Sequence, residues 1–445
     1  MGSAWHLRLF STVLAGMLVA ALAAAMPWHP AQAAPQAVVL EIDGAIGPAM
    51  AEYVTSALQG VDPRDTRLVV LRMNTPGGLD GSMRAIIAAM LASPVPVAAY
   101  VAPSGARAAS AGTYIAYAAA VAAMAPGTNL GAATPVQLGL PTGTGTQKGQ
   151  APEDAETRKI VNDAVAYIRG LAELHGRNAD WAEEAVRSAA SLPASQALKL
   201  KVIDVIAASL PDLLRQIDGR QVIADGKPVT LATADLAIVT RPPGWRTELM
   251  AIVTDPNIAF ILLLVGIAGL VFEFTTPGAI APGLIGVISL LVALFGLDLL
   301  PVDYAGAGLV LLGIALMIAE AHIGTFGVLG VGGIAAFVIG ALMMFPGTAP
   351  GFSLSRPLLA AVTVVAAGLF LIALSLLLRA RRRPVVTGRE ALIGAEGEAV
   401  SWDSAEGRVR VAGEVWRARA ARPLTPGARV RVTDRRGLML IVEPM

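Results

Sequence analysis

Five long apolar runs in the second half of the chain limit most strongly what it can fold into. They cover Ile258–Phe272, Ala279–Leu297, Ala305–Ala319, Ile323–Phe345 and Leu358–Leu378. A helical membrane span needs about 20 predominantly apolar residues, and 55% of this chain is hydrophobic whereas only 15% is charged. We therefore expect an integral membrane protein whose residues 250–380 form five spans. Because the first and third runs are short, four spans with a re-entrant segment are the alternative.

The first 33 residues have the layout of a secretory signal peptide. His6 and Arg8 give a short basic start, Leu9–Met26 is apolar, and Ala31 and Ala33 form a small-residue cleavage site. An uncleaved N-terminal anchor is the alternative. Either interpretation places the next domain, residues 35–240, outside the cytoplasm.

The charges after the last apolar run predict the orientation of the C-terminal end. Arg379 and the three arginines from Arg381 to Arg383 follow that run directly. Cytoplasmic loops are enriched in Lys and Arg, so five spans place this end inside, opposite an exported N-terminal domain. We expect a cell-membrane protein with residues 387–445 in the cytoplasm.

The apolar region also contains a candidate internal repeat. The motif Gly266–Ala268 recurs 47 positions later as Gly313–Ala315, and Glu273 corresponds to Glu320. A transporter would rest on this repeat alone. We favour capping at the interface over ion transport for the two glutamates.

Between residues 35 and 240, strand and helix patterns alternate, which predicts an α/β domain with a largely parallel sheet. The expected strands are Val38–Ile42, Arg67–Arg72 and Pro96–Val101, with a strand-like segment at Gly131–Val136, and the expected helices are Pro48–Leu58 and Leu79–Leu91.

Ser110 is the candidate nucleophile of this domain. It stands among small residues where a turn enters a helix, and an apolar run from Tyr114 to Ala123 follows. Small neighbours let a substrate backbone approach, and a helix N-terminus favours negative charge that develops nearby. A packing serine in an alanine-rich helix start is the alternative.

The turn Asn74–Gly78 is the second feature of the candidate site. Gly77 and Gly78 follow a buried strand, so their backbone N–H groups can point into a cleft and bind an oxyanion. An ordinary strand-to-helix turn is the alternative. Neither G-x-x-x-x-G-K-[ST] nor G-x-G-x-x-G is present at this turn, which argues against phosphate binding.

A serine nucleophile needs a base, and Lys159 is the candidate. The chain has no cysteine and four histidines, of which only His175 lies near the site in sequence. Lysine can serve as the base where burial favours its neutral form. The helix that carries Lys159 shows an apolar stripe formed by Ile160, Ala164, Ile168 and Leu171. A solvated surface lysine is the alternative, and Lys148, in the Gly- and Thr-rich segment Gly139–Gln150, is the rival base.

Three motifs together resemble the NfeD family of membrane-bound serine proteases, which is related to signal peptide peptidase A and the proteolytic subunit of Clp protease. They are Asn74–Gly78, Ala109–Ala116 and Ala125–Thr128. The resemblance implies a Clp/crotonase-like fold for this domain and a Ser-Lys dyad.

Carried over by position, the resemblance assigns roles to the candidate residues. Ser110 would be the nucleophile and Lys159 the general base. The backbone N–H groups of Gly78 and Ala111, with Gly77 beside them, would form the oxyanion hole. Catalysis of this kind uses no metal and no cofactor.

Residues 387–445 form a separate small domain. Five short alternating runs separated by Gly, Pro and Asp predict a small β-barrel, and the resemblance implies an OB-fold. Basic and acidic residues are nearly balanced here, so we expect a protein partner and no nucleic acid.

The sequence thus predicts a membrane-bound serine endopeptidase. The resemblance suggests that it cleaves hydrophobic segments of stomatin-like or flotillin-like membrane proteins, and we expect a homo-oligomer in the lipid bilayer. The alternative is a non-catalytic scaffold that partners such proteins.

Overall fold

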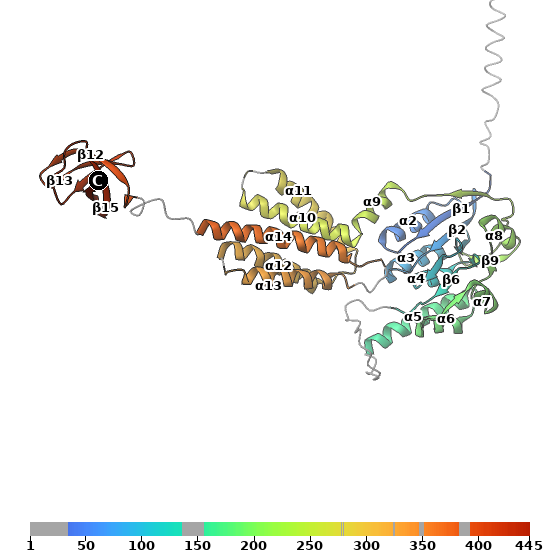
Figure 1. Cartoon of the computed structure of the whole chain (residues 1–445). Helices are drawn as coiled ribbons and strands as arrows, with labels where there is room; N and C mark the ends of the chain where they lie inside the picture. The colour runs from blue at the N-terminus through green and yellow to red at the C-terminus, as the bar shows by residue number, and fades with distance from the viewer. Residues whose placement is uncertain are drawn as a thin grey trace, which may run out of the picture. The chain divides into compact units, whose positions relative to one another are not determined.

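A computed structural model describes residues 34–135, 155–276, 278, 280–323, 325–346, 351–381 and 392–445 (Figure 1). The predicted signal peptide and the segment containing Lys148 lie outside these residues. By contacts the chain divides into two units, residues 1–313 with 335–362, and residues 314–334 with 363–445.

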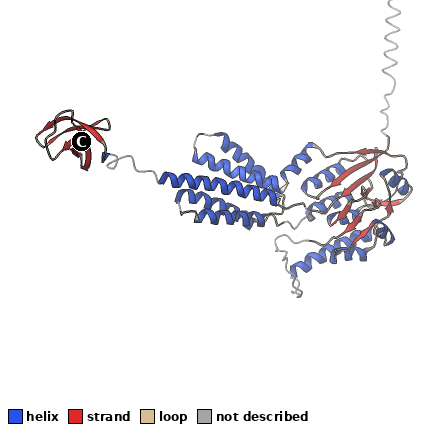
Figure 2. Ribbon diagram, viewed as in Figure 1, coloured by secondary structure: helices blue, strands red, loops and turns tan. Residues whose placement is uncertain are grey.

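The α/β domain contains a six-stranded sheet in the order β11-β1-β2-β3-β5-β8. Figure 2 shows the strands of this domain in red among its blue helices. The strands are β1 (Gln36–Asp43), β2 (Thr66–Asn74), β3 (Val97–Val101), β5 (Val121–Met124), β8 (Val205–Ile206) and β11 (Ala237–Thr240). Every neighbouring pair is parallel. The central strands read as near-continuous apolar runs, as expected for a sheet covered on both faces. The predicted α/β class with a parallel sheet is confirmed.

Helices cover both faces of this sheet. They are α2 (Pro48–Gln59), α3 (Asp80–Leu91), α4 (Ala111–Ala118), α5 (Ala155–Leu174), α6 (Ala179–Arg187), α7 (Ala194–Lys199) and α8 (Leu210–Ile217). Side chains of α2 to α6 pack with Leu40 and Leu71 in one core, whereas those of α8 pack with Val39 and Val70 in a second. The alternation of apolar side chains along β1 and β2 separates the two cores.

Two smaller sheets complete the domain. Strands β4 (Arg107–Ala109), β6 (Asn129–Gly131) and β7 (Ser191–Pro193) form one, and the antiparallel hairpin of β9 (Gln221–Ala224) and β10 (Lys227–Thr230) forms the other. The three-stranded sheet holds β4 beside the end of β2 through the bridge from Thr75 to Ala108. This bridge brings the turn after β2 next to Ser110.

The apolar run Tyr114–Ala123 contains the rest of α4, which ends at Ala118, and the start of β5 at Val121. Both parts are buried and apolar, so periodicity does not separate the helix from the strand. Two local predictions need correction. The strand expected at Gly131–Val136 is instead β6, which ends at Gly131. Ile160 is 37% exposed, so the buried stripe of α5 begins at Ala164.

The helical region begins with the short α9 (Trp245–Val253). It continues with α10 (Pro256–Thr275), α11 (Ile280–Asp298), α12 (Tyr304–Ile323), α13 (Val328–Met344) and α14 (Arg356–Arg381). Among the described residues, α10 and α11 are long and apolar enough to cross a membrane, and the apolar stretches of the other three are shorter. Each of the five predicted runs corresponds to one helix, although the fourth run begins inside the end of α12.

Glycines let α10 and α11 pack closely. A Cβ on Gly269 would lie 2.6 Å from Pro282 O, and one on Gly286 would lie 2.9 Å from Leu270 N. Small residues at such positions allow membrane helices to approach backbone to backbone.

Glu320, in the proposed repeat, is a buried cap. Its carboxylate accepts the N–H groups of Gly327 at 2.9 Å and Leu329 at 3.1 Å, at the start of α13. A carboxylate at a helix N-terminus satisfies unpaired N–H groups and complements the dipole. The capping role predicted for Glu320 is therefore confirmed.

The C-terminal domain is a closed barrel in the order β12-β13-β14-β16-β15. Its strands are β12 (Glu396–Asp403), β13 (Glu406–Val411), β14 (Glu414–Arg419), β15 (Arg429–Arg436) and β16 (Met439–Pro444). Its core is formed mainly by valines, including Val409, Val430 and Val442. Five strands closed in this way are the small OB-type barrel that was predicted.

Candidate active site

Ser110 occupies a strained turn between β4 and α4. Its φ of 50° and ψ of −116° are unusual for a residue with a side chain. Such strain persists only where the surroundings fix it. Here the Ser110 N–H donates to Gly131 O at 3.0 Å, and the Ser110 carbonyl accepts from Thr113 N at 2.9 Å. The turn-to-helix position predicted for Ser110 is the one observed.

The Thr113 side chain stabilises this turn through hydrogen bonds. Its Oγ1 lies 2.9 Å from both Ala108 O and Gly131 O, and it accepts the Gly131 N–H at 3.1 Å. The Thr113 side chain is fully buried, so these bonds are shielded from water. One hydroxyl thereby links β4, α4 and β6 next to the Ser110 turn.

The glycine turn after β2 lies directly against Ser110. Gly77 has a φ of +115°, and a Cβ at this position would lie 2.6 Å from Ser110 Cβ and 3.1 Å from Ser110 Oγ. Only glycine satisfies both the backbone conformation and this close approach. The structure therefore brings Ser110 and the predicted Gly77–Gly78 turn together.

The two glycine N–H groups are not equivalent. Gly77 N–H donates to Thr75 Oγ1 at 3.0 Å, so it is already used inside the turn. Gly78 is held by a bridge to Ile46, in which Ile46 N donates to Gly77 O and Leu79 N donates to Ile46 O. Within the described part of the chain, no acceptor is paired with the Gly78 N–H. Of the two glycines, Gly78 therefore has the N–H group that is available to donate to a bound oxyanion.

The Ala111 N–H is the second donor near Ser110. Ala111 is the first residue of α4, where backbone N–H groups have no partner inside the helix. The helix dipole adds partial positive charge at this end. Gly78, beside the Gly77 that contacts Ser110, and Ala111, next to Ser110 in sequence, are therefore two backbone donors that remain available to a ligand.

Lys159 is not bonded to this cluster in the described part of the chain. It lies on the first turns of α5 and is exposed, and among the described residues no hydrogen bond or ion pair joins it to Ser110 or to any other side chain. The burial expected for a neutral lysine is thus not provided by these residues. One turn further along, Asp163 pairs with Arg84 of α3 at 2.7 Å. Because residues i and i+4 share a helix face, Lys159 lies on the face of α5 directed toward α3, which begins just after Gly78.

The far end of α4 is fixed by an ion pair that the sequence pattern did not reveal. Arg177 Nη1 donates to Tyr117 O at 2.8 Å, and Arg177 Nη2 contacts Asp204 Oδ2 at 2.6 Å. Both side chains are largely buried. The arginine thus satisfies a carbonyl at the C-terminus of the helix whose N-terminus carries Ser110.

The environment of Asp204 keeps this pair charged. Burial raises the pKa of the Asp204 carboxyl, but the charge of Arg177, an N–H from Ala122 and the charge of Arg220 together hold that pKa below its usual range. The carboxylate bridges the two arginines, because Arg220 Nη2 lies 2.6 Å from Asp204 Oδ1. Asp204 therefore has a structural role as the partner of both arginines.

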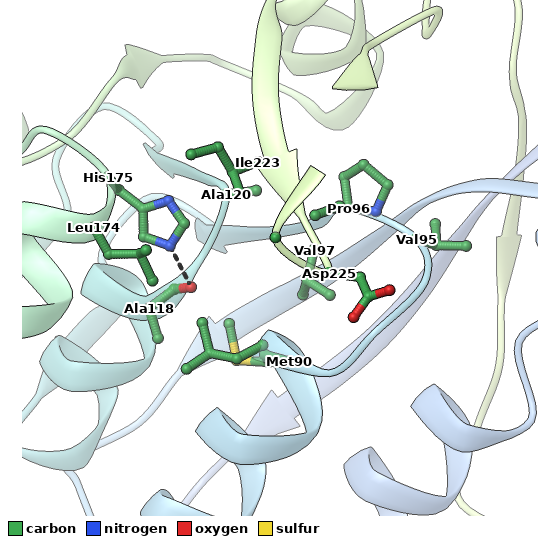
Figure 3. Close-up of a pocket in the computed structure, with 13 residues that line it drawn as sticks. Met90, Val95, Pro96, Val97, Ala118, Ala120, Leu174, His175, Ile223 and Asp225 are labelled. Carbon is green, nitrogen blue, oxygen red and sulfur yellow. Dashed lines mark hydrogen bonds between the residues drawn. The ribbon is translucent and has the colours of Figure 1, made fainter. Parts of the chain in front are cut away.

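His175 also belongs to the far end of α4 and not to the Ser110 end. Its Nε2 donates to Ala118 O at 3.0 Å beside an apolar cavity of about 160 Å³ (Figure 3). Burial and the charge of Arg177 lower the pKa of His175 to about 4. Since α4 rises about 1.5 Å per residue, its eight residues keep His175 away from Ser110. It is not a base for this serine.

These features define a membrane protein with a serine-centred site, of hydrolase type, in a parallel α/β domain. Three family models match the chain: NfeD1b, N-terminal domain, over residues 36–215, NfeD integral membrane domain over 257–376, and NfeD-like C-terminal, partner-binding domain over 389–444.

Relatives with known names cover most of the chain. The membrane-bound protease PH1510 of Pyrococcus horikoshii is 36% identical over 400 residues, which are 88% of each protein. The membrane protein NfeD1b of Bacillus subtilis is 27% identical over 341 residues, covering 74% of this chain and 71% of that protein. The chain belongs to the NfeD family.

A solved structure of the 1510-N membrane-bound stomatin-specific protease with a substrate peptide is 32% identical to this chain. It covers 50% of this chain and 99% of its own, with a TM-score of 0.44.

Proposed function

We propose that this NfeD-family membrane protein is a serine endopeptidase that uses Ser110 and Lys159. The observation that carries the proposal is the strained Ser110 turn, which lies against the Gly77 turn and next to two backbone N–H groups, those of Gly78 and Ala111, that could serve as the oxyanion hole. The relationship to a membrane-bound protease over 88% of both chains supports proteolysis as the activity.

The reaction follows from the roles of these groups. Ser110 Oγ attacks the scissile carbonyl carbon while Lys159 Nζ takes its proton, and the resulting oxyanion accepts hydrogen bonds from Gly78 and Ala111. The protonated lysine then gives its proton to the leaving amine. Water, activated by the same lysine, hydrolyses the acyl-enzyme and releases the second product.

Lys159 must approach Ser110 for this chemistry. It is the fifth residue of α5, which begins at Ala155, and its helix face is directed toward α3. We infer that substrate binding or assembly with a second copy brings the start of α5 over Ser110 and excludes water there. Lys148 remains the alternative base.

The proposed substrates are hydrophobic segments of stomatin-like membrane proteins. The small residues around Ser110 suit an apolar chain, and residues 389–444 match a partner-binding domain. With a signal peptide and five spans, the active site would face the outside of the cell and the barrel the cytoplasm. Protease added to intact spheroplasts should then leave residues 392–445 uncleaved. Digestion of the barrel from outside would contradict this topology.

A serine-reactive fluorophosphonate tests the enzymatic proposal directly. The purified full chain should be labelled at one site and should cleave a peptide that contains an apolar segment. Labelling should disappear in Ser110→Ala and persist in Ser104→Ala, which changes a serine of the preceding turn. Binding of a stomatin-like protein with neither labelling nor cleavage would instead indicate a scaffold.

A further inference from the structure

A groove between α9 and α11 has no role in the proposed proteolysis. It is lined by Trp245, Arg246, Leu249, Met250 and Val253 of α9 and by Leu291, Val292 and Phe295 of α11, and its volume is about 520 Å³. Ligand sites in proteins typically measure about 300–1,000 Å³. The volume of the groove is therefore within the range of sites that bind small molecules.

The side chains of α9 are arranged to build this groove. Positions 245, 249 and 253 are four residues apart and share one face of the helix. The end of that face presses on α11, because a Cβ on Gly296 would lie 2.4 Å from Val253 O. Glycine at position 296 permits this close contact between α9 and α11.

The groove lies at the edge of a membrane domain. The family model for the integral membrane domain begins at residue 257, four residues after α9 ends, and α11 is one of the helices long and apolar enough to span. Outward side chains of such a helix face lipid chains. Leu291 and Phe295 are 62% and 54% exposed, so the α11 wall of the groove is continuous with the lipid-facing surface.

The mouth of the groove differs in chemistry from its walls. Trp245 is exposed, and the Arg246 guanidinium lies 5.5 Å from the centre of its ring. Tryptophan and arginine are typical of the membrane–water interface. Arg246 lines the groove beside Trp245, so its guanidinium can donate hydrogen bonds to an anion bound there.

We propose that this α9–α11 groove binds one phospholipid of the surrounding bilayer. One acyl chain lies along Leu249 and Leu291, and the phosphate binds Arg246 while Trp245 packs against the glycerol region. The apolar walls match the chain and the arginine matches the anionic headgroup. The bound lipid would then fix α9, the helix that joins the protease domain to its first span.

Native mass spectrometry of the full chain in detergent tests the site, with palmitoyl-oleoyl phosphatidylglycerol as the probe. One lipid should remain bound to the wild-type protein. Leu249→Ser should lower its retention about tenfold, whereas Ile252→Ser should leave it unchanged. The pair is matched, because Leu249 and Ile252 are 53% and 55% exposed on the same helix, but only Leu249 lines the groove.

Two further variants keep the test decisive. Arg246→Gln should weaken retention of phosphatidylglycerol, and Leu291→Ser, on the opposite wall, should act like Leu249→Ser if the latter does not fold. Equal losses in Leu249→Ser and Ile252→Ser would mean unspecific lipid contact and overturn the proposal. So would a dimer that Leu249→Ser dissociates, because the groove would then hold a second copy of the chain.

Discussion

The two halves of the proposed dyad are built in opposite ways. The Ser110 half is held by hydrogen bonds from three elements, and the neighbouring Gly77 leaves no room even for a methyl group. The Lys159 half lies on an exposed helix face, with no partner for its amine among the described residues. The fold of the single chain therefore fixes Ser110 but does not hold the Lys159 amine in place.

If the proposed dyad is correct, this difference predicts an enzyme whose site is complete only after substrate or a second copy has bound. A preformed oxyanion site binds charge without reorganisation, whereas a lysine base has to lose water to become an effective acceptor of protons. Leaving the lysine exposed until substrate or a second copy covers it would restrict proteolysis to the assembled state. The predictions below separate the two halves.

The largest effect is expected for Ser110→Ala. Peptide cleavage should fall about 10⁴-fold or more, which is typical when the nucleophile is removed from a set of catalytic residues that act jointly. The melting temperature should change little, because the bonds of this turn come from the Ser110 backbone. Cleavage assays and thermal melts of the same preparations measure both quantities. Cleavage at the wild-type rate would exclude Ser110 as the nucleophile.

The second effect concerns the base. Lys159→Arg and Lys159→Ala should both reduce cleavage about 10²- to 10⁴-fold, the contribution typical of a general base, because arginine does not lose its proton at usable pH. Lys148→Ala should retain most activity. The measurement is the peptide cleavage rate of each variant as pH is raised. Turnover in Lys159→Arg together with an inactive Lys148→Ala would move the base to Lys148.

A third, smaller effect is expected at the glycine turn. Gly77→Ala introduces a methyl group 2.6 Å from Ser110 Cβ at a φ of +115°, which should destabilise the protein by about 1–3 kcal/mol. Cleavage should fall roughly 10²-fold through misplacement of the serine. Gly81→Ala, in α3, is the matched control, because no atom lies within 4 Å of its Cβ. Equal behaviour of the two in cleavage and denaturant unfolding would contradict the contact.

The smallest effect is a pH dependence at the far end of α4. His175 has a folded pKa of about 4, below its ordinary value of 6.5, so the unfolded state binds more protons between these values. Stability should therefore fall as the pH is lowered through that window. His175→Gln keeps a donor for Ala118 O and should flatten the melting temperature between pH 4 and 6.5. An unchanged slope in this variant would assign the dependence to other groups.

Below pH 4, the pH dependence of stability should come from Asp204. Its folded pKa is lowered, so its contribution is present above the unfolded value of 3.8 and is lost as the pH falls further. Removing one member of a buried pair typically costs about 3–5 kcal/mol. This end of α4 is therefore a stability element, distinct from the catalytic end.

Local patterns in the sequence predicted much of this molecule. Ser110 and the Asn74–Gly78 turn could be singled out because three motifs occur together and resemble one family, whereas each motif alone also fits an ordinary packing role. The five apolar helices followed from run length alone. The barrel strands were evident because apolar and polar residues alternate along them.

Contacts between distant positions could not be predicted in this way. Strand β11 returns to pair with β1 some 200 positions earlier, and nothing in its four residues indicates that partner. The pairing of Arg177 with Asp204 spans 27 positions. Exposure of Lys159 depends on which elements cover the start of α5, and a single helical stripe does not contain that information.

The position of β11 has a mechanical consequence. It is an edge strand, it runs parallel to β1 from Ala237 to Thr240, and α9 begins five residues later. A force that pulls α9 away from the start of β1 would act along these parallel strands, so it would load the β1–β11 hydrogen bonds in shear, and they would break together and not one after another. Pulling single molecules between Gln36 and Gly244 should give one abrupt rupture, whereas gradual opening at low force would contradict this geometry.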